Sequence, residues 1–363
     1  MNHLIRCMIS FFFLLIVLPI QGEASESMGS NPNEFAYEVV LPENQKRTDV
    51  GYYDLVMKAG ETQTLQLKLF NLSSESMKIS LSVNSAKTNG NGLIEYGENQ
   101  LETDSSLTYD IKKLVTTPKE VLLAPHSKKM VELRIDLPAK PFIGYLAGGI
   151  QLTPFRYTEQ TTKEEAVILN EFAYVIGLLI SESDSHQLAP EMALNGMSLK
   201  KRDGQYGLSV SLSNVQPVFL ENLTTQVRIR KKGTKAILFE KKQSDMRMAP
   251  NSVMNFPVEL EGTELDSGDY VVEVTTSTTN GKHWMWKKEF TFSKLEAQRV
   301  NEINNLTKNG YFNQPLFLGC TLVLCIVIFG SVWVIMRRNT HLSNGRRKRT
   351  GNYINEKKKK KTN

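Results

Sequence analysis

Residues 62–84 read TQTLQLKLFNLSSESMKISLSVN, and this stretch decides the fold class. Apolar residues occupy every second position from Leu65 to Leu69 and again from Met77 to Val83, with polar residues between them. A period of two places successive side chains on opposite faces of an extended chain, so one face is buried and the other meets water. The stretch therefore predicts β-strands that each cover one side of an apolar core.

The same alternation recurs further along the chain, at Val131–Leu137, Leu208–Leu212 and Val272–Val274. Turns that contain glycine separate the apolar runs, at 58–60, 89–92, 267–269 and 280–281. Many short strands divided by such turns are typical of antiparallel sandwiches. We therefore predict an all-β fold.

A polar stretch at 157–165 (YTEQTTKEE) lacks any apolar period and divides the β region into two parts of normal domain size. We predict two tandem immunoglobulin-like β-sandwich domains, over 34–156 and 166–293, joined by this stretch as a linker. The next segment, 294–315, carries apolar residues near helical spacing. This spacing favours a short juxtamembrane helix, and a solvated stalk is the alternative.

The first residues are typical of a secretion signal. Arg6 precedes the apolar run Met8–Ile20, and small residues follow up to Ala24. We therefore predict a signal peptide over 1–24. A retained anchor is the alternative, but the run is short for the ~20 residues that a membrane span needs.

Leu316–Met336 contains no charged residue and would rise ~31 Å as a helix, which matches the ~30 Å hydrocarbon core of a bilayer. A basic tail follows over 337–363 and begins with Arg337 and Arg338. Basic residues next to a span favour the cytoplasmic side. We therefore predict a single-pass membrane protein with an extracellular body, one C-terminal transmembrane helix and a cytoplasmic tail.

The net charge of +6 is misleading about partners. A basic tail could bind nucleic acid, but beside a span it more simply fixes orientation on the anionic inner leaflet. Outside the tail and the signal, acidic residues outnumber basic ones. The composition therefore gives no support for a nucleic-acid partner.

Cysteine usage indicates the cell type. Cys7 lies in the predicted signal, and Cys320 and Cys325 lie in the predicted span, so the exterior part has no cysteine. Animal secreted domains lean on disulfides. A body without cysteine therefore favours a bacterium, and a single membrane that faces outward favours a Gram-positive one.

The residue types needed for catalysis do not form a recognisable motif. The exterior histidines, His126, His186 and His283, are too widely spaced for a local metal site. The chain has no Gly-x-Ser-x-Gly elbow or P-loop, and Ser198–Lys201 fits Ser-x-x-Lys without its companion motifs. We therefore predict a protein that is not an enzyme and needs no metal or cofactor.

Aromatic and amide residues gather in the first half of the chain. Aromatic rings stack on the C–H faces of sugars, and amides pair with sugar hydroxyls, so this combination favours a polysaccharide surface. The alternative is that the tyrosines are half-buried strand residues and the asparagines shape turns. The candidate residues are Asn44, Gln45, Tyr52, Tyr53, Asn89, Asn91 and Tyr96.

Trp284 and Trp286 lie two residues apart and so share one face of a predicted strand. Tryptophan is enriched at binding hot spots, which favours a partner surface here. The alternative is packing in the core.

Several short motifs occur in the order typical of one family. In the first half they include Tyr52-Tyr53-Asp54-Leu55, Thr88-Asn89-Gly90-Asn91-Gly92 followed by Tyr96, and Gly148-Gly149-Ile150. In the second half they include Tyr174-Val175-Ile176, Met248-Ala249-Pro250-Asn251-Ser252, Ser267-Gly268-Asp269-Tyr270 and Trp284. Over about 34–310 the chain resembles the WxL-interacting proteins of Gram-positive bacteria.

The resemblance implies a non-catalytic surface scaffold or adhesin. Its first domain would bind peptidoglycan, and its second would bind host extracellular matrix or plant polysaccharide. WxL-domain surface proteins are the other implied partners, and Tyr270, Trp284 and Trp286 are the candidate residues for partner binding. The alternatives are a single-pass extracellular receptor that signals through its tail and a wall-modifying accessory protein.

Overall fold

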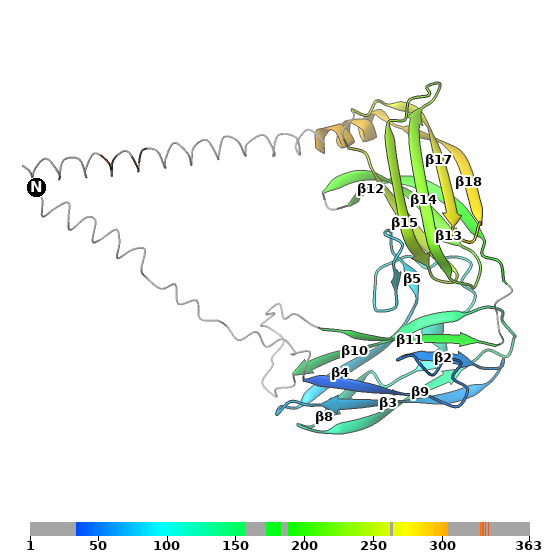
Figure 1. Cartoon of the computed structure of the whole chain (residues 1–363), viewed down its shortest axis with the longest axis vertical. Coiled ribbons are helices and arrows are strands. Elements are labelled where there is room, and N and C mark those ends of the chain that lie inside the picture. The colour runs from blue at the N-terminus through cyan, green and yellow to red at the C-terminus, as the bar shows by residue number, and fades with distance from the viewer. Residues whose placement is uncertain are drawn as a thin grey trace, which may run out of the picture.

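The computed structural model describes residues 34–156, 172–182, 188–202, 204–261, 264–303 and the single positions 327, 329, 331 and 333. Over these residues the regular structure is almost entirely β-strand, arranged as two sandwiches that meet at an angle (Figure 1). The prediction of an all-β fold is therefore confirmed.

The first sandwich is built from two sheets. One sheet has the strand order β1-β3-β9-β7, and the other has the order β2-β11-β10-β4-β8. The strands of the first sheet are β1 (Phe35–Val40), β3 (Thr62–Asn71), β9 (Lys128–Asp136) and β7 (Val115–Thr116). Those of the second are β2 (Tyr53–Val56), β11 (Tyr174–Ser181), β10 (Leu146–Arg156), β4 (Met77–Ser85) and β8 (Glu120–Leu123).

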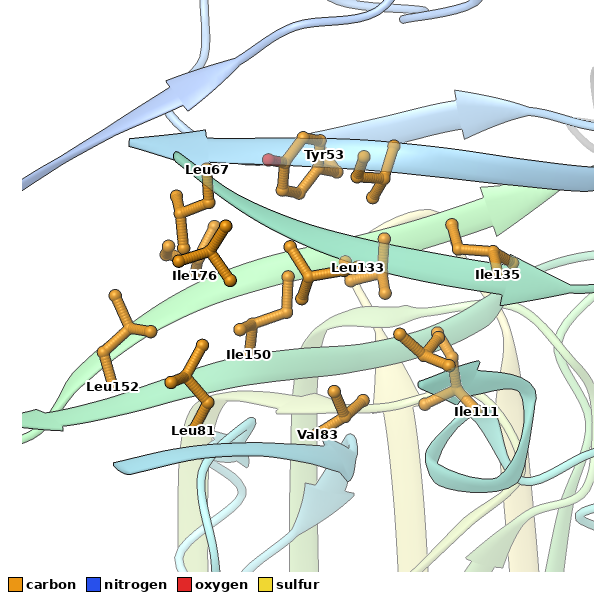
Figure 2. Close-up of a cluster of buried hydrophobic side chains, with 14 of the residues drawn as sticks. Tyr53, Leu67, Leu81, Val83, Ile111, Leu133, Ile135, Ile150, Leu152 and Ile176 are labelled. Atoms are coloured by element: carbon orange, nitrogen blue, oxygen red, sulfur yellow. The ribbon is translucent and has the colours of Figure 1, made fainter. Parts of the chain in front are cut away.

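Residues 62–84 supply one strand to each sheet, because β3 and β4 lie in opposite layers. Their alternating apolar side chains meet in the core, where Leu67 and Ile79 are fully buried. Figure 2 shows Leu67, Leu81 and Ile150 pointing into this space between the sheets. Each such side chain contributes ~1.5–3 kcal/mol by leaving water.

The polar turn between β3 and β4 is held by Asn71, whose side chain is buried. Its Nδ2 donates to the carbonyl oxygens of Glu75 at 2.7 Å and Ala124 at 2.9 Å, while its Oδ1 accepts from the Ser73 amide at 3.0 Å. These bonds satisfy backbone groups that the turn leaves unpaired.

Strand β11 lies beyond the predicted linker but belongs to the first sandwich. It pairs antiparallel with β10 and parallel with β2, and Ile176, Leu178 and Ile180 enter the first core. The predicted linker 157–165 lies outside the described residues, and the strand that follows it completes the first sandwich. The chain passes to the second sandwich only after Ser181. Alternation predicts a strand here, but it does not indicate which sheet accepts that strand.

The second sandwich also has two sheets, with the orders β12-β13-β16 and β15-β14-β17-β18. Its core includes Leu208, Val227, Phe256 and Val272, all at most 1% exposed. The strands of the first sheet are β12 (Met192–Arg202), β13 (Gln205–Asn214) and β16 (Ser252–Glu259). Those of the second are β15 (Phe239–Met248), β14 (Leu220–Lys231), β17 (Gly268–Thr278) and β18 (His283–Phe292).

A helix over 294–303 follows β18. Ser293 and Glu296 form a capping box, in which the Ser293 amide donates to Glu296 Oε2 at 2.8 Å and the Glu296 amide donates to Ser293 Oγ at 3.2 Å. Ala297 and Val300 are buried in the second core. The hypothesis of a helix is therefore confirmed for these residues, which belong with the second sandwich. The rest of 294–315 lies outside the described residues.

The predicted signal (1–24) lies outside the described residues, as do the basic tail and all but four positions of the predicted span. Those four, Val327, Phe329, Ser331 and Trp333, are helical. Within the described part of the chain, no helix has the length and apolar character needed to span a bilayer.

The two sandwiches are joined through a hairpin of the first, formed by β5 (Lys87–Thr88) and β6 (Ile94–Glu95). Figure 1 shows β5 between the sandwiches. Thr88 Oγ1 lies 2.7 Å from Ser252 Oγ and accepts from the Ala249 amide at 3.0 Å, while the Arg247 amide donates to the Gly92 carbonyl at 2.8 Å. Further bonds across the interface join Asn91 to Gln243, Asp104 to Ser213, Ser106 to Asn251 and Tyr145 to Pro217.

The loop after the hairpin leads to the short helix α2 (Ile111–Leu114). Asp110 caps this helix, because its Oδ1 accepts from the Lys112 amide at 3.0 Å. Ile111 is buried in the first core. The loop is thus fixed at both ends, by the second sandwich and by the first core.

Candidate functional site

A cleft of about 890 Å³ lies where the two sandwiches meet. The first sandwich lines it with residues around β2, β6 and β11, and the second lines it with residues around β14 and the end of β15. Its aromatic residues are Tyr52, Tyr96, Tyr145 and Phe219. A concave surface with several aromatic side chains and a few polar groups is the usual form of a ligand site.

Two glycines lie beneath the tyrosines of this cleft. Gly149 of β10 and Gly177 of β11 are directly opposite each other in the sheet. A Cβ at position 149 would lie 2.5 Å from the Tyr96 carbonyl oxygen and 2.7 Å from the Tyr96 Cβ. The missing side chain therefore lets the segment around Tyr96 lie directly on β10.

We expect Gly149→Ala to displace Tyr96, because the added methyl would overlap backbone that cannot rotate away. Overpacking of this kind costs ~1–3 kcal/mol. Gly177→Ala is the matched control, since its Cβ would meet Tyr52 at 3.5 Å, an ordinary contact. Thermal unfolding of the two variants measures the difference. Equal midpoints would contradict the close approach of Tyr96 to the sheet.

Charged residues surround the aromatic rings in pairs. Arg247 forms two bonds with Glu221, Nε to Oε2 at 2.6 Å and Nη2 to Oε1 at 2.7 Å. Arg47 lies 5.4 Å from the centre of the Tyr52 ring, and its Nε lies 3.4 Å from Asp54 Oδ2. The cleft thus offers planar polar groups beside aromatic faces.

An aromatic pair, Tyr145 and Phe219, lies at the junction of the sandwiches. Their ring centres are 5.7 Å apart, and Lys46 Nζ lies 6.0 Å from the Tyr145 ring centre.

Burial raises the pKa of the Tyr96 phenol, and the nearby Arg247 partly offsets this rise. Tyr96 is therefore neutral at physiological pH, and its hydroxyl can both donate and accept a hydrogen bond.

The structure brings two of the predicted site residues, Tyr52 and Tyr96, together in the cleft. Tyr53 lies elsewhere, because it is fully buried in the first core and its hydroxyl donates to the Gln66 carbonyl at 2.7 Å. Figure 2 shows Tyr53 among the core side chains. Adjacent strand residues face opposite sides, so Tyr52 and Tyr53 could not both face one ligand.

Asn44 and Gln45 use their amides inside the protein. Asn44 exchanges two bonds with Gln63, at 2.9 Å and 2.8 Å. Gln45 Nε2 donates to the Tyr52 carbonyl at 2.9 Å, and its Oε1 accepts from the Asp54 amide at 3.1 Å. These residues therefore shape the backbone that carries Tyr52 into the cleft.

Asn89 and Asn91 line a different cavity of about 690 Å³ between the hairpin and the second sandwich. Asn89 Oδ1 accepts from the Asn91 and Leu93 amides at 2.9 Å and 3.1 Å. This is the turn-shaping role that the alternative interpretation assigns to asparagine. The second sandwich adds basic and polar residues to this cavity, among them Lys200, Lys201, Arg202, Tyr206, Lys241 and Asn255.

The predicted partner residues occupy two environments. Tyr270 is 1% exposed, and its hydroxyl donates to the Asp266 carbonyl at 2.9 Å, so it lies within the fold. Trp284 and Trp286 are half-buried against the second core. Trp284 Nε1 donates to Glu191 Oε1 at 3.1 Å. Both rings lie on β18, the last strand of its sheet, and remain partly accessible.

Sequence reasoning missed most of the cleft, including Tyr145, Phe219, Glu221, Arg247 and Asp54. The pair Gly148-Gly149 was the one local signal, because consecutive glycines in a strand mark a close approach of another segment. The rest depends on how the sandwiches dock. Within the described residues, no three His, Cys, Asp or Glu side chains gather as a metal site would require.

The chain is thus a protein of two docked β-sandwiches with an aromatic cleft between them. Residues 35–154 match the family model for the WxL Interacting Protein, peptidoglycan binding domain, and residues 163–302 match the model for its host binding domain. Because the two matches cover well over half of the chain, the chain belongs to the WxL Interacting Protein family. Both models describe binding domains, so a binding role at the cell surface follows.

A comparison with curated proteins gives no match. Among solved structures, the chain is similar to the ASH/PapD-like domain of human CEP192, with 16% identity, a TM-score of 0.26 and coverage of 43% of this chain and 92% of that one. It is also similar to the Escherichia coli chaperone DraB, with 11% identity, a TM-score of 0.26 and coverage of 71% and 98%. TM-scores this low add nothing to the strand order described above.

Proposed function

We propose that this protein is a non-catalytic scaffold of the cell surface that binds peptidoglycan in the cleft between its two sandwiches. The observation that carries the proposal is the convergence of Tyr52, Tyr96, Tyr145 and Phe219 with two ion pairs in one cleft. The match of residues 35–154 to a peptidoglycan binding domain supports the class of ligand.

The chemistry of the cleft suits a wall polymer. Aromatic rings stack on the C–H faces of sugar rings, and the paired arginines and carboxylates can bond to sugar hydroxyls or peptide groups. Phe219, Glu221 and Arg247 come from the second sandwich. A ligand held here would therefore contact both family domains, although only the model for the first domain is described as peptidoglycan binding.

We also propose that both sandwiches have an immunoglobulin-like fold. The second sandwich places its strands in a three-stranded and a four-stranded sheet, as immunoglobulin-like domains do. This strand order supports an immunoglobulin-like fold. The five-stranded sheet of the first sandwich, with its parallel β2–β11 pair, is a larger variant of the same plan.

The location of the protein is proposed from the sequence. A signal at 1–24, an uncharged stretch at 316–336 and a basic end at 337–363 support a single-pass membrane protein with its sandwiches outside a Gram-positive cell. This arrangement would hold the cleft beside the wall without a covalent link to it.

WxL-domain surface proteins and host or plant material are the proposed partners of the second sandwich. The family name and the match to a host binding domain support them. Trp284 and Trp286, half-buried on the edge strand β18, are the side chains best suited to a partner contact. Tyr270 is excluded as a partner-contact residue because its side chain is buried.

We expect Tyr52→Ala together with Tyr96→Ala to weaken binding of the purified full-length protein to cell-wall sacculi about tenfold or more. Each lost ring removes a stacking surface worth ~0.5–1.5 kcal/mol, and 1.4 kcal/mol is a factor of ten in affinity. Co-sedimentation with purified sacculi measures the bound fraction.

Tyr206→Ala is the control, because this half-buried tyrosine lines the other cavity. It should sediment with sacculi as the unchanged protein does. The proposal fails if the unchanged protein stays in solution, or if the double variant in the cleft binds as well as the Tyr206 variant.

A further inference from the structure

Asp54 is an unusual residue in the wall of the cleft. It follows the core residue Tyr53 on β2, and it is 5% exposed. Its backbone is fixed on both sides, because its amide donates to Gln45 Oε1 at 3.1 Å and its carbonyl accepts from the Lys46 amide at 2.6 Å. The carboxylate is therefore held in one place beside the cleft that it lines.

The two oxygens of this carboxylate differ. Oδ2 lies 3.4 Å from Arg47 Nε, whereas no described residue donates a hydrogen bond to the buried Oδ1. Buried polar atoms are nearly always hydrogen-bonded, and a charged acceptor without a donor is costly to bury. An unpaired oxygen at the wall of a ligand cleft is therefore a group prepared for a donor from outside the chain.

The charges of the cleft favour one kind of ligand group as the hydrogen-bond donor to Asp54 Oδ1. Arg47 already contacts Asp54, and Lys46 and Arg247 also line the cleft, whereas Asp54 and Glu221 are its only acids among the residues that the structure describes. An incoming ammonium group would be repelled by these neighbours. A neutral hydroxyl or amide N–H would not be, and the rings of Tyr52 and Tyr145 give it an apolar surface on which to stack.

We propose that the cleft recognises the glycan strand of the wall polymer, not its stem peptide, and that Asp54 Oδ1 accepts a hydrogen bond from a neutral group of a sugar. This inference rests on the proposed function and adds the part of the ligand that is recognised. Asp54 is then a specificity residue, with Arg47 holding its carboxylate beside the Tyr52 ring.

Asp54→Asn separates this role from a structural one. The substitution keeps the shape and removes the charge. If Asp54 served only to pair with Arg47, the variant should lose stability. If Oδ1 is kept unpaired for a ligand, the variant should melt at the same temperature or higher while binding becomes weaker, because residues held for function are often not optimal for stability.

The experiment titrates the full-length protein with two probes, a β-1,4-linked tetramer of N-acetylglucosamine and a free stem pentapeptide. We expect binding of the tetramer only, at least tenfold weaker in Asp54→Asn, with an unchanged or raised melting temperature. Asp136→Asn is the control, because Asp136 is also paired with an arginine, Arg134, but is exposed and lines neither cavity. It should bind the tetramer normally.

The inference is overturned if the pentapeptide binds in place of the tetramer, or if the Asp54 variant and the unchanged protein bind the tetramer with equal affinity. A fall in the melting temperature of the Asp54 variant also overturns it. If neither probe binds while sacculi still sediment through Tyr52 and Tyr96, this inference fails and the proposed function stands. If the sacculi do not bind either, both fail.

Discussion

A fragment that ends at residue 156 is expected not to fold, although it contains the whole match to the peptidoglycan binding domain. It lacks β11, whose Ile176, Leu178 and Ile180 are at most 1% exposed in the first core. Removing one large aliphatic side chain from a core costs ~2–5 kcal/mol, and a whole domain is stable by only ~5–15 kcal/mol. The loss of three such side chains therefore exceeds what the first sandwich can sustain.

The loss of hydrogen bonds acts in the same direction. β11 lies between β2 and β10, so without it both strands present unpaired edges and β2 loses its only neighbour in the described sheet. Exposed edges of this kind promote aggregation. Circular dichroism and size-exclusion chromatography of fragments 34–156 and 34–182 make the comparison.

A matched pair of substitutions in the full-length chain tests the same point without truncation. Leu178→Ala empties a fully buried position on β11, whereas Val175→Ala changes a position that is 41% exposed on the same strand. We expect a loss of ~2–5 kcal/mol for the first and less than ~1 kcal/mol for the second. A well-folded 34–156 fragment, or equal effects of the two substitutions, would show that β11 is dispensable.

Gly92→Ala is expected to loosen the docking of the two sandwiches. Gly92 lies in the hairpin with φ of +69°, and a Cβ there would lie 2.4 Å from the Met246 Cβ. Met246 is buried in the second core, so it has little room to move. The variant combines a left-handed backbone penalty of ~1–2 kcal/mol with overpacking of ~1–3 kcal/mol at the interface.

Gly233→Ala isolates the backbone part of this effect. Gly233 has φ of +83°, and nothing lies within 4 Å of the position that its Cβ would take. Urea unfolding should therefore show a larger loss for Gly92→Ala, and small-angle scattering should show a larger radius of gyration for that variant alone. Identical stabilities and radii in the two variants would mean that Met246 yields without cost.

The sequence predicted the positions of the strands better than it predicted which strands pair in a sheet. Alternation at Leu65–Leu69 and Met77–Val83 is strong because one face of each strand is buried, and the structure confirms both strands. The same alternation in 174–181 carries no information on which sheet accepts the strand. Its placement depends on pairing with β2, a strand about 120 residues away, through contacts that no local pattern records.

The site was predicted in part, for a related reason. Aromatic character singled out Tyr52 and Tyr96, which both line the cleft, but the same criterion included Tyr53, which the period of two turns into the core. Asn89 was chosen for an amide that the hairpin itself uses. Phe219 and Arg247 carry no local signal, because they become part of a cleft only when a second sandwich is placed against the first.

The shared strand β11 also governs how the two modules could be exchanged. It falls within the segment matched to the host binding domain, yet it completes the core of the other domain. Recombination at 157–165 would give one parent's first sandwich the other parent's β11, with side chains not shaped for that core. Working chimaeras between relatives should therefore be joined after Ser181, so that each module inherits its own buried strand.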